Sequence, residues 1–279
     1  MLLIAAAVLH TAWNYLVKKV RAKQIFTWWT LVIGCVFYIP LIWLHWPIPV
    51  QVWPYALASA LAETIFFIAL LRAYENGDFS LVYPIARGAA PAMLAIWALI
   101  FLGERPRPMG AAGLCVLIIG VTIVGGANLL KGRSTINVSL RGMSAALLIS
   151  FWISVYSTID GAAVRIMAPQ SYAALVLTLT AVFLAPVIFS RYGTRAIAAE
   201  LRENLLRIFA VAFMMLATFI FVLQAFTLSH VSYVAATREM SVILAAFVGW
   251  RFMGEEFGSI RTIGSVLIFL GILCIAVAG

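Results

Sequence analysis

The sequence predicts an all-α membrane protein with ten transmembrane helices, arranged as two inverted five-helix repeats. Composition is the first observation behind this prediction: 65% of the 279 residues are hydrophobic, 10% are charged, and the mean hydropathy is +1.07. Soluble domains are closer to half apolar and a quarter charged. The second observation is a set of ten continuous apolar runs, and the third is a motif that recurs 151 residues further along the chain.

The apolar runs define the expected helices. Each is close to the 17–25 residues that a helix needs to cross the hydrocarbon of a bilayer. They cover residues 2–18, 25–45, 52–72, 79–102, 109–129, 140–160, 170–190, 206–228, 231–252 and 259–278. Five runs precede a polar linker and five follow it, and because five is odd, the second set must be inverted relative to the first. We expect one repeat over 1–130, a cytoplasmic linker over 131–139, and the inverted repeat over 140–279.

The repeat is visible as matched residues in spans four and five and in spans nine and ten. The stretch from Val82 to Gly120 recurs between Tyr233 and Gly271. The matched pairs are Arg87 with Arg238, Ala95 with Ala246, Glu104 with Glu255, Gly113 with Gly264, and Gly120 with Gly271. Two copies of one hydrophobic unit are the usual plan of a secondary transporter, whose binding site lies where the repeats meet.

The basic residues predict the orientation. One set of alternate loops holds fourteen of them: Lys18, Lys19, Arg21, Lys23, Arg72, Lys131, Arg133, Arg141, Arg191, Arg195, Arg202, Arg207, Arg251 and Arg261. The other set holds only Arg105, Arg107 and Arg165. Because cytoplasmic loops carry the excess of Lys and Arg, this bias places both termini on the outer side.

Several function classes find no support in the sequence. The net charge is +9, but no basic stripe with interleaved aromatic residues indicates nucleic-acid binding, and loops beside anionic lipid account for the charge. Cys35, Cys115 and Cys274 lie inside apolar runs, without disulfide or metal spacing. No motif for hydrolysis, zinc or nucleotide binding occurs, so we expect no enzyme activity, no cofactor and no metal.

Two arginines inside spans are the main candidates for substrate binding. A charged group in a span costs roughly 2.5–3.5 kcal/mol on insertion scales, so its presence needs a reason. Tyr83, Arg87 and Pro91 share one face of span four, and Pro91 removes the N–H that would bond the carbonyl of residue 87, which predicts a bend there. Arg238 is the counterpart in span nine, followed by Glu239. The alternative is that both arginines only pair with carboxylates to hold helices together.

Three other spans carry polar residues. Glu63 lies near the middle of span three and is a candidate for a functional carboxylate, or for a structural partner of an arginine. In span one, His10 and Asn14 share a face, with Trp13 alongside. Span six carries a similar stripe of Trp152, Tyr156 and Asp160, where Asp160 precedes Gly161 and has the alternative role of an interfacial helix cap.

The remaining duplicated residues indicate architecture. Glu104 and Glu255 follow glycines at the ends of spans four and nine, which suggests a structural role such as pairing with Arg105 or Arg251. Small-residue faces on spans five and ten carry Gly113, Gly120, Gly264 and Gly271. Such faces allow close helix approach, either as a scaffold or as a homodimer contact.

Taken in order, these motifs resemble the drug/metabolite transporter superfamily, specifically its ten-helix EamA-type transporters. The pieces that carry the resemblance are His10-Thr-Ala-Trp-Asn14 with Lys18, Tyr83-Pro-Ile-Ala-Arg87-Gly, Phe101-Leu-Gly-Glu104-Arg, Tyr156-Ser-Thr-Ile-Asp160-Gly, and Thr237-Arg238-Glu239 followed by Gly254-Glu255. The resemblance covers the whole chain. It implies a bacterial inner-membrane carrier that moves small metabolites by alternating access, with a cavity lined by spans 1, 3, 4, 6, 8 and 9. The pattern is similar to a branch associated with phosphonate utilisation.

The leading hypothesis is a secondary transporter of a small anionic or zwitterionic metabolite, with a proton or ion as a possible coupling partner. A guanidinium binds carboxylate and phosphonate in bidentate fashion, and Glu63 or Glu239 would hold an amine. One alternative is efflux of amphiphilic cations, with Trp13, Phe66, Trp97, Trp152 and Tyr156 as the binding surface. An intramembrane enzyme acting on lipid head groups and a non-transporting scaffold are the alternatives from other classes.

Overall fold

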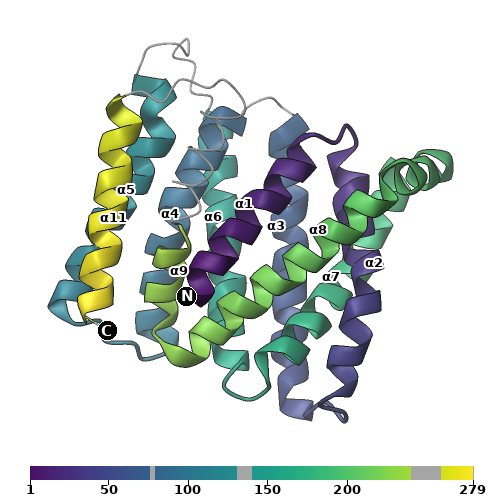
Figure 1. Cartoon of the computed structure of the whole chain (residues 1–279), viewed down its shortest axis with the longest axis horizontal. Helices are drawn as coiled ribbons and strands as arrows, with labels where there is room; N and C mark the ends of the chain where they lie inside the picture. Colours follow the sequence, from purple (N-terminus) through teal and green to yellow (C-terminus); the bar gives the residue numbers. More distant parts are fainter. Residues whose placement is uncertain (76–78, 131–139, 240–258, 279) are drawn as a thin grey trace. The chain divides into compact units, whose positions relative to one another are not determined.

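The computed structural model is built from α-helices, as predicted (Figure 1). It describes residues 1–75, 79–130, 140–239 and 259–278, and for 18, 71–75, 79–88, 124–130, 140–143, 259–262 and 276 it describes the backbone alone. The helices are α1 Leu2–Lys18, α2 Lys23–Trp43, α3 Trp53–Glu75, α4 Phe79–Phe101, α5 Pro108–Leu130, α6 Leu140–Ala163, α7 Pro169–Arg191, α8 Thr194–Leu228, α9 Val231–Arg238 and α11 Ser259–Ala278, with a short 3₁₀ turn, η1, at Val50–Val52. Most bounds agree with the expected spans to within a few residues, and no strand occurs in the described ranges.

Local sequence explains where several helices begin and end. α7 begins at Pro169, directly after Ala168, because proline lacks only an N–H that the first turn would leave unbonded. α4 is followed by Gly103, whose φ of 67° lies in the left-handed region that glycine adopts without steric cost. That turn allows the N–H of Glu104 to return to the carbonyl of Ala98 at 3.1 Å.

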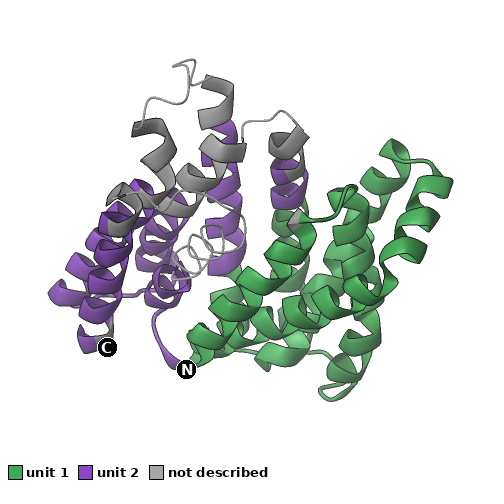
Figure 2. Ribbon diagram, turned by 45° about the horizontal axis from the view of Figure 1, so that its top comes forward, with its two compact units in different colours: residues 1–64, 159–227 green, residues 65–158, 228–279 purple. Residues whose placement is uncertain are grey.

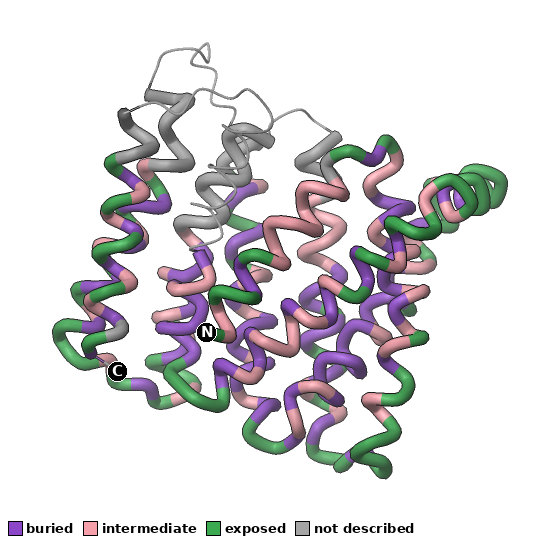
Figure 3. The backbone as a smooth tube through the Cα atoms, viewed as in Figure 1, coloured by how far each residue is buried: buried purple, intermediate pink, exposed green. Residues whose placement is uncertain are grey.

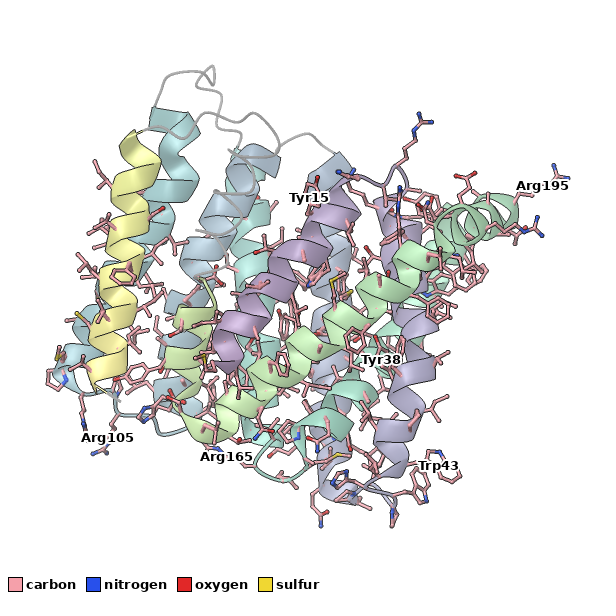
Figure 4. The ribbon with its side chains drawn as sticks, viewed as in Figure 1. Tyr15, Tyr38, Trp43, Arg105, Arg165 and Arg195 are labelled. Carbon is pink, nitrogen blue, oxygen red and sulfur yellow. The ribbon has the colours of Figure 1, made fainter. Side chains whose placement is uncertain are left out.

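α8 begins twelve residues earlier than the expected span 206–228. Its first part, from Thr194 to Glu203, is too charged to be read as a span, yet it is rich in alanine and other strong helix formers. Asn204 breaks the regular helix with φ −122° and ψ 17°, which separates this first part from the apolar part. Ile197 is buried whereas Arg195 and Arg202 are exposed, so the first part is amphipathic (Figure 4).

The chain divides into two compact units that each combine helices from both halves of the sequence (Figure 2). Unit 1 comprises Met1–Thr64 and Ile159–Thr227, and unit 2 comprises Ile65–Thr158 and Leu228–Gly279. This division differs from the predicted repeats at 1–130 and 140–279, which stay a prediction from sequence. Each unit is described by itself below.

The core of unit 1 is formed where α2 packs on α7 in antiparallel orientation. The indole N–H of Trp28 donates to the carbonyl of Ala181 at 3.1 Å, and its ring meets that of Phe189 edge-on at 5.4 Å. At this end of the pair, Tyr192 also bonds Gln24. Buried positions follow the length of α7 (Figure 3). α2 and α7 are the second helices of the two expected repeats.

The core of unit 2 contains the pair α5 and α11, which are the last helices of the two repeats. A Cβ atom on Gly113 would lie 2.8 Å from the carbonyl oxygen of Gly271, and one on Gly120 would lie 2.8 Å from that of Gly264. Leu117 and Ile268 fill the space between these contacts. The small-residue faces therefore join two helices of one chain. The expected homodimer stays a prediction, and it would need other faces of α5 and α11.

Helix length and composition agree with a chain that crosses a membrane several times. Within the described ranges, five helical segments are long and apolar enough to span a bilayer: 23–43, 50–70, 144–163, 169–191 and 194–228. Four shorter helical segments, 2–17, 89–101, 108–123 and 263–275, are also apolar. Many large apolar side chains, among them Phe101, Leu206 and Val277, face outward, where lipid would cover them.

Candidate functional site

Glu63 lies on α3 inside unit 1, with 7% of its surface exposed. The hydroxyl of Thr180, on α7, donates to its Oε2 at 3.0 Å and also bonds the carbonyl of Val176 one turn earlier. A carboxylate in an apolar bundle requires such donors, because an unbonded charge there is strongly disfavoured. The structure thus places Glu63 away from either end of its helix, in contact with a neighbouring helix.

Asp160 is a second buried carboxylate of unit 1, and its side chain is 0% exposed. Ser59, on α3, donates to Oδ1 at 2.5 Å, and the phenol of Tyr172, on α7, donates to the same atom at 2.9 Å. These two donors are side chains of other helices, so Asp160 links α6 to α3 and α7. The alternative role, an interfacial cap at the end of α6, stays a prediction from sequence.

Tyr38 adds a third ionisable side chain beside these carboxylates. Its side chain is fully buried, and its hydroxyl has no hydrogen-bond partner among the described residues. The ring folds back onto Gly34 one turn earlier, where a side chain would collide with the phenol oxygen. The hydroxyl lies in the neighbourhood of Glu63. Figure 4 marks Tyr38 within the unit, whereas Trp43 projects at the end of the same helix.

We refer to six residues as the acidic cluster: Ser59, Glu63, Asp160, Tyr172, Thr180 and Tyr38. They come from α2, α3, α6 and α7, and all are buried. Only Glu63 was singled out from the sequence as a site residue. Ser59 with Glu63 at i, i+4, and Tyr172 with Thr180 at i, i+8, are polar pairs on single helix faces, and this signal could have indicated the cluster.

The expected site residues of α1 also lie in unit 1. The amide of Asn14 donates to the carbonyl of His10 at 2.7 Å, which occupies it within its own helix. The rings of His10 and Trp13 meet edge-on at 4.9 Å. The indole N–H of Trp13 is buried without a hydrogen-bond partner among the described residues. All three side chains are half-buried, and their role in substrate binding stays a prediction.

In unit 2, Trp152 and Tyr156 belong to a group of aromatic rings. Tyr156 packs against Phe66 at 5.9 Å, and Trp152 meets Phe151 edge-on at 5.4 Å. Phe151 in turn contacts Trp97, whose indole N–H donates to Ser154 at 3.0 Å. Four of the five aromatic residues expected to bind a cation therefore belong to unit 2, and Trp13 belongs to unit 1.

Arg238 is the last residue of α9 and is half-buried, and Glu239, its C-cap, is buried. A cation in the last turn interacts favourably with the helix dipole, so the helix alone stabilises this arginine to a modest degree. The matching residues of span four, Arg87 and Tyr83, lie outside the residues whose side chains are described. Pro91 is buried within α4.

Glu104 has a structural role, but with partners that differ from those expected. Its carboxylate accepts from the N–H of Val231 at 2.5 Å and from the N–H and hydroxyl of Ser232 at 3.2 and 2.6 Å. It therefore caps the N-terminus of α9, where a negative charge is favourable, while Arg105 is exposed. Glu255 and Arg251 lie outside the described residues.

The polar groups of the candidate site are carboxylates, hydroxyls and an arginine. No group of three metal-ligating side chains that could hold an ion occurs in the described ranges. The cysteines of these ranges are free, with Cys115 exposed and Cys35 and Cys274 half-buried. What the structure offers is two carboxylates held by hydroxyl donors in unit 1, and an arginine with an adjacent carboxylate in unit 2.

Comparison with known proteins agrees with this architecture. The model of the EamA-like transporter family matches residues 1–126 and 140–277. A crystal structure of a protein 17% identical to this chain superposes with a TM-score of 0.73, covering 99% of this chain and 96% of that chain. At that identity the likeness shows the fold alone. No curated protein matches the chain.

Proposed function

The chain belongs to the EamA-like transporter family, and from this premise we propose that it is a secondary transporter of a small anionic or zwitterionic metabolite. It moves this solute across a bacterial inner membrane by alternating access, in which two inverted repeats expose one site to each side in turn. The family consists of membrane transporters of the drug/metabolite type, so the solute class and the mechanism are the parts proposed here.

The choice of solute rests on one observation, the position of Arg238. Its guanidinium is half-buried at the end of α9, beside a buried carboxylate, in a chain with few charges. A planar guanidinium binds a carboxylate or phosphonate through two parallel hydrogen bonds. Glu239, the next residue, is a second charge in this part of the chain and suits the amine of a zwitterion such as an amino acid or an aminophosphonate.

Glu63 is the proposed coupling group of this transporter. It is buried on a helical segment, residues 50–70, that is long and apolar enough to span a bilayer. The hydroxyl of Thr180 bonds either the protonated or the ionised carboxyl, because a hydroxyl both donates and accepts. A carboxyl that exchanges a proton in this setting can link proton movement to solute movement.

The test is transport by purified protein in proteoliposomes. A thermal-shift screen against amino acids, phosphonates and quaternary amines selects the solute, whose uptake is then followed with and without a proton gradient. We expect uptake of an anionic or zwitterionic solute, and we expect Glu63→Gln to abolish its dependence on the gradient while folding is retained. Glu203→Gln, an exposed carboxylate on α8, is the matched control. Full proton-driven uptake by Glu63→Gln would exclude Glu63 from coupling.

A second candidate function, efflux of amphiphilic cations, is favoured by the aromatic group of unit 2. Faces of Phe, Tyr and Trp attract cations. Phe66 and Trp97 are half-buried, and Phe66 packs against the buried ring of Tyr156. The same screen separates the two functions. Stabilisation by quaternary amines but by no anion or zwitterion would replace the first proposal with this one.

A further inference from the structure

The acidic cluster contains a carboxyl group, Asp160, that the proposed function does not use. It is fully buried, although the ionised form of such a group is costly to remove from water. Two of its hydrogen bonds come from other helices, from Ser59 on α3 and from Tyr172 on α7. A buried carboxyl at a point where three helices meet is therefore a candidate for a role beyond holding the helices together.

The geometry of Asp160 suits a group that gains and loses a proton. Both hydroxyls donate to the same atom, Oδ1. Protonation at Oδ2 therefore leaves both hydrogen bonds in place, and the carboxyl changes charge without a rearrangement of α3 or α7.

Asp160 and Glu63 lie along one interface of unit 1. Ser59 and Glu63 are one turn apart on α3, and Tyr172 and Thr180 are two turns apart on α7. The two carboxyls are thus separated by about 6 to 12 Å along the helix axes. Asp160 lies nearer the end at which α3 and α7 begin and α6 ends, and Glu63 lies deeper.

Other titratable groups surround this interface. From α2, Tyr38 and Cys35 lie near this interface. From α7, Tyr172 donates to Asp160 at 2.9 Å and lies in the neighbourhood of Glu63. His45, just after α2, bonds Ser171 at 2.7 Å, at the end of α7 that carries Tyr172. The hydroxyl of Tyr38, without a partner among the described residues, gives the cluster a donor that is still available.

We propose that Asp160 is a proton-binding site that works in series with Glu63, so that protons enter unit 1 at Asp160 and reach Glu63 along the interface of α3 and α7. The proposal rests on the transport function proposed above and extends its coupling from one carboxyl to two. The proton adds to Asp160, leaves it for a water molecule or a neighbouring hydroxyl, and then adds to Glu63; no other bond changes.

Infrared difference spectroscopy of the full-length protein in lipid tests this directly and needs no solute. The carbonyl stretch of a protonated carboxyl is followed as the pH is changed, in buffers containing either sodium or choline. Asp160→Asn is the main variant, because the amide oxygen still accepts from Ser59 and Tyr172 but cannot take a proton. Its folding is checked by thermal unfolding.

We expect the wild-type carbonyl band to contain one component that disappears in Asp160→Asn and another that disappears in Glu63→Gln. Tyr172→Phe removes one donor to the ionised form, so the pH midpoint of the Asp160 component should move by about one to two pH units toward higher pH. The control Tyr233→Phe, which removes a buried hydroxyl without a partner in the described ranges, should leave both components unchanged. A band unaffected by Asp160→Asn in a folded protein would overturn the proposal. A titration seen only when sodium replaces choline would overturn it in favour of a sodium site.

Transport measurements separate failure of this proposal from failure of the proposed function. If the protein transports a solute, Asp160→Asn should lose at least tenfold of its proton-driven uptake and retain solute exchange at equal pH. Undiminished proton-driven uptake in this variant would refute the Asp160 step and leave the transport function standing. Absence of any transport by the wild type would refute the function, while the infrared titration would still show whether Asp160 binds a proton.

Discussion

A guanidinium and an ammonium carry the same charge but differ in geometry, and this difference separates the two roles open to Arg238. The guanidinium is a rigid, planar fork that matches a carboxylate or phosphonate through two hydrogen bonds, whereas an ammonium is a compact point charge. An arginine that only pairs with a nearby carboxylate tolerates lysine at a cost in stability. An arginine that binds the solute loses the bidentate contact.

We predict that at least one of the two variants, Arg238→Lys and Arg87→Lys, weakens solute binding by roughly 1.5–3 kcal/mol. This corresponds to about ten- to hundredfold in affinity. The measurements are the dissociation constant and the melting temperature of each purified variant. Arg195→Lys, an exposed arginine on α8, is the control and should change neither. A lower melting temperature with unchanged affinity in both variants would show that these arginines serve the architecture only.

At the scale of helices, the pair α5 and α11 depends on glycines that allow two backbones to approach closely. At Gly113, a side chain would meet the backbone oxygen of Gly271 at 2.8 Å and the Cβ of Cys274 at 2.9 Å. A backbone atom cannot move aside as the end of a flexible side chain can. The helices themselves would have to separate, with loss of packing around Leu117 and Ile268.

We therefore expect Gly113→Ala to destabilise the protein by roughly 1–3 kcal/mol, the usual cost of overpacking a well-packed core. Thermal unfolding of the purified protein in detergent is the measurement. Gly193→Ala is a matched control, because nothing lies within 4 Å of the Cβ that it would add, and its effect should stay within about 0.5 kcal/mol. Equal melting temperatures for the two variants would contradict the close packing of α5 on α11.

At the scale of the whole molecule, orientation in the membrane is a prediction from the basic loops, and the ends of unit 1 offer positions at which to test it. α2 and α7 are antiparallel, since Trp28 bonds Ala181 near one end and His45 bonds Ser171 near the other. Gln51, beyond α2, and Thr194, beyond α7, therefore lie at opposite ends of this pair, and both are exposed. The excess of Lys and Arg belongs to the Thr194 end, so we predict that this end lies in the cytoplasm.

A cysteine at Gln51 should react with an impermeant thiol reagent added outside intact cells, and a cysteine at Thr194 should react only after the membrane is opened. The experiment uses a background in which Cys35, Cys115 and Cys274 are replaced. Labelling after lysis serves as the control that both sites are reactive. The reverse pattern would place both termini in the cytoplasm instead of outside.

Much of this protein can be predicted from the sequence, because the bilayer restricts what an apolar chain can form. Runs of about twenty apolar residues indicate helices. In the structure, most of these helices begin and end within a few residues of the expected positions. α8 is the exception: hydropathy excludes its charged first part, although alanine-rich sequence before Asn204 favours a helix. The buried position of Glu63 and the structural role of Glu104 also follow from the sequence.

The sequence by itself therefore determined the fold class, the helix positions and the family motifs, since these depend on local hydropathy and on a repeat within one chain. The partners of each polar group depend on packing between distant segments, and only the tertiary structure decided them. Ser59 and Asp160 are 101 residues apart, and Glu63 and Thr180 are 117 apart. No local pattern shows which helix faces will meet, because in hydrocarbon an apolar face packs equally well against many others, and only the polar contacts and the small-residue faces select one arrangement.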